Sequence, residues 1–576
     1  MPGFFLALDM ETPTLKNYDD TRCRRGALRG DGFALCRNTL DKFMDDKLLF
    51  EDADYTVCLE GVVYNKAALM HGYGKTDWRE TVRALLDERG ERFMEALDGP
   101  VSGAVRFARN GCWLVFTSRL GEKAVFYWQD GRRFVCGSQL DYVADALRVN
   151  GVERRADETA LRQFLGYGCY ADESTCLCGV KRLYPGSCLR FDPASGGLTV
   201  GSYYLADWPE ELEGTEEELI RALDGSFRAA MQKILDKDKE YGYTTVLDCS
   251  AGLDSRMVCY AAAALGAENV LVQSYGQSGC ADIRIAEKIS AELGFDFVCR
   301  TLDNADCMMH IEDNMCMNSG SASYYHITGG VAMLKMLDRG GFGLECTGLL
   351  GDVGASAFYD EEYDGDKIDK NYLRFRNSHL LEYGGDFVCP DSADGRFRWQ
   401  VNDRFWFYTR GCLFGMSSYF LRQNFMEAAT PFGDPEFLRV YLRIPRMHRV
   451  RTQLLKKWLL RCYPAAGRYP YGESAVPLKW SSGRWARLAH YYDRLREEIG
   501  GRLHPDRPQG MNDISYWYRH NGRFRHMVGT YWEENLDACR AYPAIEALLR
   551  RMYASDVTGD KLMALSVLAM FRLYIR

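Results

Sequence analysis

The residues with the clearest chemical potential lie between Ser250 and Ser255, in the stretch Ser-Ala-Gly-Leu-Asp-Ser. A β-branched apolar run at 244–247 precedes them and predicts a buried strand, while the alanine-rich stretch 256–265 predicts a helix. The first N–H groups of such a helix have no internal partner, and the helix dipole favours negative charge there. Gly252 allows close backbone approach, and the two serines add hydroxyl donors. The stretch therefore predicts an anion site.

Asp254 lies inside this loop. A carboxylate beside an anion needs a cation or an ammonium group between them, so a nucleotide with Mg²⁺ fits the residue types. The loop does not have the GxxxxGK[ST] spacing of the usual phosphate loop. The alternative, which these residues alone leave open, is an ordinary strand-to-helix turn.

Length and charge limit the remaining possibilities. A chain of 576 residues is too long for one core, which predicts several domains. The content of 47% hydrophobic and 26% charged residues is that of an ordinary soluble protein. The net charge is −8 and no basic stripe is evident, so we expect no nucleic acid partner.

The lack of targeting signals and the number of cysteines together predict a cytoplasmic protein. The N-terminus lacks the basic start and long apolar stretch of a signal peptide. No apolar run approaches the roughly 20 residues that cross a membrane, and 562–575 reads as a docked amphipathic helix. The 20 cysteines, without export signals, indicate buried thiols in a reducing compartment. Cys176 and Cys178 are the tightest pair, without a CxxC motif, so zinc is not expected.

The hydrophobic pattern changes between the two parts of the chain. Residues 1–205 alternate short strands with turns and contain helical patterns at 77–89 and 157–166, which predicts an α+β sandwich. An acidic joint at 206–216 follows. Residues 206–576 begin with a strand–helix alternation, which predicts a parallel sheet with ligands at the carboxyl ends of its strands. The expected elements are strands at 270–275, 295–300 and 341–346 and a helix at 282–293.

Several motifs in the chain resemble those of known families. Ser250–Ser255 resembles the S-G-G-x-D-S pyrophosphate loop of ATP pyrophosphatases, with alanine at the first glycine. The first half carries matches to the glutaminase domain of asparagine synthetases. Glu60–Asn65 resembles N-G-E-I-Y-N, Arg119–Tyr127 resembles R-L-G-E-K-P-L-Y-Y, and Gly179–Gly186 resembles G-I-x-K-L-P-P-G. The resemblance implies an N-terminal nucleophile-hydrolase-like sandwich followed by an ATP-pyrophosphatase domain with a helical C-terminal extension.

The second half continues the resemblance to the asparagine synthetase family. Thr347–Gly354 resembles the family's S-G-E-G-S-D-E loop, Pro431–Phe437 its P-F-L-D-x-x-F segment and Lys457–Arg461 its K-x-x-L-R segment. By resemblance, Asp254 and Asp352 hold Mg²⁺, and Lys457 is the catalytic residue that reaches the phosphates. The nucleotide-binding residues expected on this basis are Ser250, Ala251, Gly252, Leu253, Asp254, Ser255, Tyr275, Thr347 and Gly348.

The chain departs from the family pattern at positions that matter for chemistry. The family's glutaminase uses an N-terminal cysteine as its nucleophile, and Pro2 stands here. The family's glutamine-holding residues are replaced at Glu60, Val62 and 117–118, which leaves Asp77 as the one remnant. We therefore expect no glutamine hydrolysis, as in the β-lactam synthetase-like relatives that lack the cysteine.

Leu349 stands where the family has a catalytic glutamate, and leucine cannot take a proton. Either Tyr359, Glu361 or Glu362 takes the proton, or the amine arrives deprotonated.

These observations predict an ATP- and Mg²⁺-dependent, AMP-forming carbon–nitrogen ligase. It would adenylate an unidentified carboxylate and transfer it to ammonia or an amine. Two alternatives stay open: an asparagine synthetase that uses ammonia, and a nucleotide-binding scaffold without catalysis. A homodimer is also left open, and 506–576 is either a cover for the acceptor site or a packed helical extension.

Overall fold

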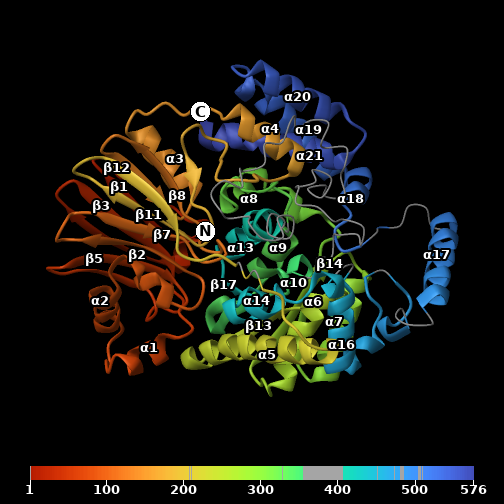
Figure 1. Cartoon of the computed structure of the whole chain (residues 1–576). Coiled ribbons are helices and arrows are strands. Elements are labelled where there is room, and N and C mark those ends of the chain that lie inside the picture. Colours follow the sequence, from red (N-terminus) through yellow and green to blue (C-terminus); the bar gives the residue numbers. More distant parts are fainter. Residues whose placement is uncertain are drawn as a thin grey trace.

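Figure 1 shows the computed structural model of the chain. The structure describes residues 2–354 and 407–575, apart from positions 207, 209, 327, 450–451, 473, 481–485, 504–507 and 509.

Two antiparallel sheets form the first part of the chain and pack face to face (Figure 1). The first sheet has the order β10 (Lys181–Arg182), β8 (Phe126–Asp130), β9 (Arg133–Gly137), β1 (Gly3–Leu8), β3 (Phe33–Leu40), β2 (Cys23–Gly30). The second has the order β12 (Gly197–Ser202), β11 (Ser187–Asp192), β7 (Trp113–Phe116), β6 (Val101–Phe107), β5 (Tyr55–Gly61), β4 (Leu48–Glu51). The predicted sandwich is therefore present.

Strand β1 shows how the sandwich is layered. Side chains alternate across a strand, and Phe4 and Leu6 enter the core between the two sheets, whereas Phe5 and Ala7 enter a second core on the outer face of the first sheet. Helices cover that face, among them α3 (Leu140–Val149) and α4 (Glu158–Tyr167). On the outer face of the other sheet lie α1 (Lys66–Gly72) and α2 (Trp78–Arg89).

A five-stranded sheet forms the centre of the second part, and all its neighbouring strands are parallel. Its order is β15 (Asp296–Thr301), β14 (Val270–Gly276), β13 (Thr244–Asp248), β16 (Phe342–Cys346), β17 (Glu427–Ala429). The parallel sheet and the first four of these strands match the sequence-based expectation. Because the strands are parallel, the loops after β13, β14 and β16 meet at one edge.

Helices surround this sheet. The long helix α5 (Glu216–Tyr241) begins with a capping box, as the sequence pattern indicates. In it the Thr215 side chain accepts the N–H of Glu218, and the Glu218 side chain accepts the N–H of Thr215. The other helices are α6 (Leu253–Ala264), α7 (Ala281–Leu293), α8 (Ile311–Met317), α9 (Thr328–Met336), α10 (Gly351–Gly354), α13 (Ser417–Arg422), α14 (Pro435–Tyr441), α15 (Arg446–Arg449) and α16 (Gln453–Cys462). Helix α17 (Ala486–Leu503) stands away from the sheet (Figure 1).

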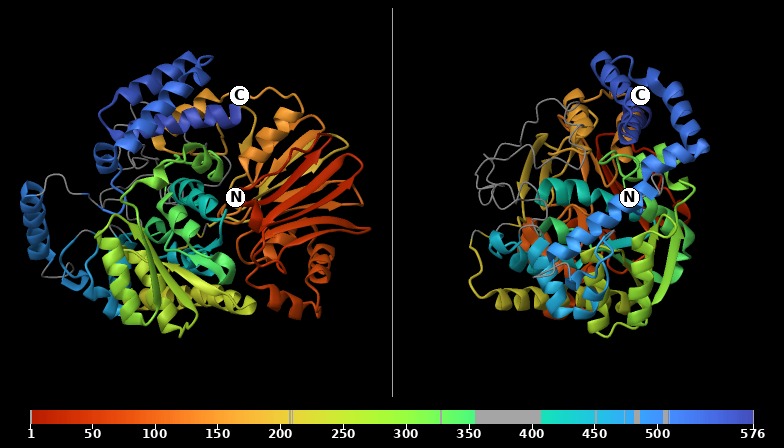
Figure 2. Two further views of the ribbon diagram at one scale, coloured as in Figure 1. Left: turned by 180° about the vertical axis from the view of Figure 1, so that it is seen from behind. Right: turned by 90° about the vertical axis from the view of Figure 1, so that its right-hand side faces the viewer.

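The last residues form a packed helical group. Its members are α18 (Ile514–His520), α19 (Gly522–Asn535), α20 (Pro543–Ala554) and α21 (Thr558–Met570), and it caps one end of the molecule (Figure 2). The docked helix expected at 562–575 is present, but it is not amphipathic over Leu562–Met570, because every residue of that stretch is buried. The apolar stretch is enclosed on several sides by α4, α8, α19 and α20.

The two parts of the chain share a core. One buried cluster contains Phe164 of α4 together with Tyr275 of β14 and Phe571 at the chain's end. The hydroxyl of Tyr542 accepts the backbone N–H of Ala156, 2.9 Å away. The division of the chain into domains at 205/206 therefore stays a prediction. In the structure, side chains from both sides of this boundary pack in one core.

Two further expectations concern membranes and thiols. No helix in the described residues is long and apolar enough to cross a membrane. All cysteines among the described residues are free thiols, and most are buried.

A buried carboxylate joins the sandwich to the parallel sheet. Glu427 of β17 pairs with Lys47 at 2.8 Å and with Lys123 at 2.6 Å, and all three side chains are almost fully buried. Burial opposes the charge of Glu427, but the two ammonium groups lower its pKa to about 2. Lys123 belongs to the R-L-G-E-K motif, so this glutaminase-like motif serves here as a contact between the two parts.

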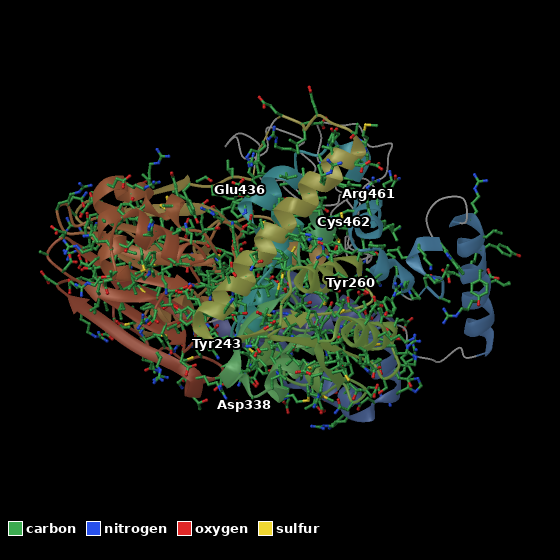
Figure 3. All side chains as sticks on the ribbon, turned by 90° about the horizontal axis from the view of Figure 1, so that it is seen from below. Tyr243, Tyr260, Asp338, Glu436, Arg461 and Cys462 are labelled. Atoms are coloured by element: carbon green, nitrogen blue, oxygen red, sulfur yellow. The ribbon has the colours of Figure 1, made fainter. Side chains whose placement is uncertain are left out.

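Replacing this carboxylate should destabilise the protein strongly. Glu427→Gln leaves Lys47 and Lys123 buried without a counter-charge, and we expect a loss of about 3–5 kcal/mol in the free energy of unfolding. Urea denaturation followed by circular dichroism measures it. Glu436→Gln is the control, because Glu436 pairs with Arg439 on the surface of α14 (Figure 3) and should change stability by less than about 1 kcal/mol. Equal shifts in the two variants would refute the buried role.

Candidate functional site

The loop after β13 closes on itself through its hydroxyl groups. The Ser255 Oγ accepts the backbone N–H of Ser250, and the Ser250 Oγ accepts the N–H of Gly252, each at 3.1 Å. The helix begins at Leu253 and not at Arg256 as expected, because extended Gly252 already acts as its N-cap. Asp254 and Ser255 therefore lie in the first helical turn, where the unpaired N–H groups are.

Arg256 fixes this loop from behind. Its fully buried guanidinium donates to the carbonyl of Ala251 at 2.9 Å and to that of Ala466 at 3.0 Å. It also donates to the carbonyls of Tyr469 and Pro470. The sequence pattern indicated only a helical residue at this position. Its role as a clamp depends on the segment 464–470, which is distant in sequence.

A second loop, which follows β16, lies directly against the first. A Cβ atom on Gly348 would lie 2.5 Å from the backbone nitrogen of Ser255, and one on Gly351 would lie 2.6 Å from Oδ1 of Asp254. Only glycine permits these approaches. Thr347 Oγ1 accepts the N–H of Leu349 at 3.2 Å and shares a hydrogen bond with the Tyr419 hydroxyl at 2.8 Å.

The contact between the loops brings two carboxylates together. Oδ1 of Asp254 is enclosed and has no hydrogen-bond partner within the described part of the chain, although the residue as a whole keeps some exposure. Burial, with the nearby charge of Asp352, raises the pKa of Asp254 well above its usual value. A buried acceptor without a donor beside a second carboxylate fits a cation, and oxygen ligands suit Mg²⁺.

A cavity of about 340 Å³ opens where the two loops meet. The predicted residues that line it are Ser250, Gly252, Asp254, Ser255, Tyr275, Thr347, Gly348 and Asp352. Ala251 and Leu253 belong to the same loop but are buried behind the cavity wall. Leu349 also lines the cavity, together with Met511 and Asn512 from the segment before α18.

Sequence reasoning missed a polar network in this lining. Arg422 of α13 donates to Asp248 at 2.7 Å, to Glu345 and to the hydroxyl of Tyr275 at 2.9 Å. The amide nitrogen of Gln273 donates to Asp248 and to Glu345, each at 2.6 Å. Burial and the charge of Asp248 raise the pKa of Glu345 to about 8, although Arg422 opposes this shift.

A signal for this network was present in the sequence. Asp248, Gln273 and Glu345 interrupt otherwise apolar strands, and polar residues in buried strands require partners. The strand register then places Asp248 opposite Gln273.

Comparisons with known proteins bear on both parts of the chain. The model of the glutamine amidotransferase domain family matches residues 41–204. "Asparagine synthetase [glutamine-hydrolyzing] 3" of Bacillus subtilis (strain 168) is 26% identical over 219 residues. This match covers 36% of the present chain and 34% of that protein, so the chain spans about a third of the length of this curated relative.

Over this matched stretch the chain is similar to an asparagine synthetase.

Two solved structures are similar in part. One is the structure of the allosteric regulatory enzyme of purine biosynthesis, with 11% identity and a TM-score of 0.23 over 52% of this chain and 74% of that one. The other is the glutamine phosphoribosylpyrophosphate amidotransferase from B. subtilis, with 10% identity and a TM-score of 0.23 over 53% and 85%.

Among the asparagine synthetase-like features, the expected catalytic lysine does not reach the cavity. Lys457 lies on α16, is about half exposed and pairs with Glu216 at the start of α5. Figure 3 shows the neighbouring Arg461 beside that end of α5, where it pairs with Glu217. Lys457 is absent from the cavity lining. Its catalytic role stays a prediction from the resemblance, and Tyr359, Glu361 and Glu362 lie outside the described residues.

The amidotransferase-like domain shows packed residues where a glutamine site is expected. Glu60 is buried, and its Oε2 accepts the Thr39 hydroxyl at 2.6 Å. Val62 is fully buried. Asp77 lies exposed on the surface, and its carboxylate caps α2 by accepting the N–H of Glu80 at 2.9 Å. Its interpretation as a remnant of a glutamine-holding acid stays a prediction from the resemblance.

The contact between the two loops should tolerate no added side chain. Gly348→Ala would place a methyl group 2.5 Å from the backbone nitrogen of Ser255 in α6, which is closer than van der Waals contact allows. We expect this overpacking to lower the free energy of unfolding by about 1–3 kcal/mol. Gly341→Ala is the matched control, since its Cβ would meet nothing within 4 Å. Thermal unfolding of both variants measures the effect. A Gly348→Ala protein as stable as the Gly341→Ala protein would show that the loops do not touch.

Proposed function

We propose that the chain is an ATP-dependent, AMP-forming ligase that adenylates a carboxylate and transfers it to ammonia or an amine without glutamine hydrolysis. The observation that carries this proposal is the convergence of the two glycine-containing loops on one cavity, with Asp254 and Asp352 side by side. The relationship to asparagine synthetases supports a ligase that forms carbon–nitrogen bonds.

The chain's own groups suit the binding of a triphosphate. One loop provides several hydrogen-bond donors for phosphate oxygens. They are the N–H groups in the first turn of α6 and the hydroxyls of Ser250 and Ser255. Asp254 and Asp352 would hold Mg²⁺, which supplies the positive charge that neutralises the phosphates. Arg256 and the contact at Gly348 hold the two loops in place before the nucleotide arrives, so the site is pre-organised for charge stabilisation.

The nitrogen donor would be ammonia or an amine. Pro2, which has no thiol, immediately precedes β1, and Ser138 Oγ accepts the N–H of Phe4 within that strand at 3.1 Å. Buried Glu60 and Val62 occupy the positions at which asparagine synthetases hold glutamine. In this proposal the amidotransferase-like domain is a scaffold, fixed to the ligase part by Glu427 and its two lysines.

Two alternatives differ from this proposal in one respect each. An asparagine synthetase that uses ammonia would share the adenylation and differ only in its acid. A nucleotide-binding scaffold without catalysis is favoured by the apolar side chain of Leu349 in the lining. It is also favoured by Lys457, which is not among the lining residues and pairs with Glu216. Such a scaffold would bind ATP but release no pyrophosphate with any acid.

Adenylation should depend on Asp254. A panel of carboxylic acids should include one that supports exchange of labelled pyrophosphate into ATP, and Asp254→Asn should lower that exchange at least about 100-fold. Asp130→Asn, in the exposed turn between β8 and β9, is the control and should retain full exchange. ATP binding without exchange for every acid would favour the scaffold. Full exchange in Asp254→Asn would mean that the site is wrongly placed.

Glutamine should not serve as a nitrogen donor. Because no thiol stands at the start of β1 and Glu60 is engaged internally, incubation with glutamine should release glutamate only at the background rate. Coupled glutamate dehydrogenase detection measures this. Ammonium chloride in the same assay should support AMP formation with the correct acid. Glutamate release above background would overturn this part of the proposal.

A further inference from the structure

The floor of the cavity carries a polar group that ATP–Mg²⁺ binding does not explain. Asp248, Gln273 and Glu345 come from three neighbouring strands and are joined by hydrogen bonds. We propose that this floor binds the protonated amino group of the acceptor amine. The inference rests on the proposed function and names the charge state and class of its second substrate: a primary ammonium cation.

Gln273 provides the most specific observation. Its side chain is fully buried, and its amide nitrogen donates to both Asp248 Oδ1 and Glu345 Oε1. Two carboxylate acceptors fix the orientation of the amide, so the Oε1 atom must face the other way. Oε1 has no hydrogen-bond partner among the described residues, and Gln273 lines the cavity. A buried acceptor without a donor is costly, and a ligand N–H group would satisfy it.

The charge of the lining favours a cation. Asp248, Asp254 and Asp352 line the cavity, and Arg422 is the only cationic side chain among the lining residues that the structure describes. The Arg422 guanidinium is already engaged by Asp248, by Glu345 just behind the lining and by the Tyr275 hydroxyl. It therefore has little capacity left to bind a carboxylate or phosphate. Asp248 and Glu345 place two carboxylates against the single positive charge of Arg422. The floor therefore carries net negative charge once Glu345 is ionised, and the pKa of Glu345 is raised to about 8 by burial.

An ammonium group suits this floor better than a second metal ion. Both oxygens of Asp248 already accept hydrogen bonds, and one of the donors is a guanidinium cation 2.7 Å away. A divalent ion would lie close to that positive charge. No group of three or more metal-ligating side chains occurs within the described residues. A primary ammonium has three N–H donors and a single charge, which match the Gln273 oxygen and the remaining lone pairs of Asp248.

The test measures amine binding without ATP or an acid. Isothermal titration of the full chain compares propylamine, which is protonated at neutral pH, with propan-1-ol, its neutral counterpart. We expect propylamine to bind and propan-1-ol not to bind. Asp248→Asn and Gln273→Met should each weaken propylamine binding at least about tenfold. Asp192→Asn, in the exposed turn between β11 and β12, should bind as the unaltered protein does.

The possible results separate this inference from the proposed function. Absence of propylamine binding to the unaltered protein would overturn the inference, as would equal binding by Asp248→Asn and Gln273→Met when circular dichroism shows both to be folded. Displacement of propylamine by MgCl₂ alone would mean a metal site, and a loss of ATP affinity in Asp248→Asn with propylamine binding intact would mean a nucleotide contact. Both results would also overturn it. Pyrophosphate exchange is measured separately, so the ligase proposal can fail while the amine site stands, and the reverse.

Discussion

The contact of Gly348 and Gly351 with the first turn of α6 is the constraint on which the site depends. It brings the carboxylates of Asp254 and Asp352 together, although like charges repel and burial disfavours the charged form of Asp254. Arg256 fixes the first loop from one side, and the hydrogen bond between Thr347 and Tyr419 fixes the second from the other. These neighbouring contacts hold the two carboxylates in an otherwise unfavourable arrangement. Such an arrangement is typical of sites that bind a cation together with an anion.

The same logic applies where the two parts of the chain meet. Three almost fully buried charged side chains, Glu427, Lys47 and Lys123, satisfy one another there. Each alone would be costly to bury, so the three together favour one relative position of sandwich and sheet. Strand β17, which carries Glu427, is also the neighbour of β16, which carries Glu345. The ion cluster at the domain contact and the floor of the cavity thus lie on adjacent strands.

The amidotransferase-like domain also contributes to the packing of the second part of the chain. Its helices α3 and α4 share a core with β14 and with the C-terminal helices, so removing the domain would expose apolar surface of the second part of the chain. The C-terminal helical group completes that core, and its buried helix α21 lies against α4 and α8. The segment just before this group contributes Met511 and Asn512 to the cavity.

The sequence by itself determined the local elements and the first half of the site. The patterns of 2 and about 3.6 residues predict strands and helices, and small residues after an apolar strand predict the loop at Ser250–Ser255, because these properties depend on neighbours in the chain. Only the tertiary structure decided that the loop after β16 touches α6, that Asp248, Gln273, Glu345 and Arg422 form one network, and that Lys457 pairs with Glu216. These contacts join residues far apart in sequence, and their geometry depends on strand order and register, which local patterns do not contain.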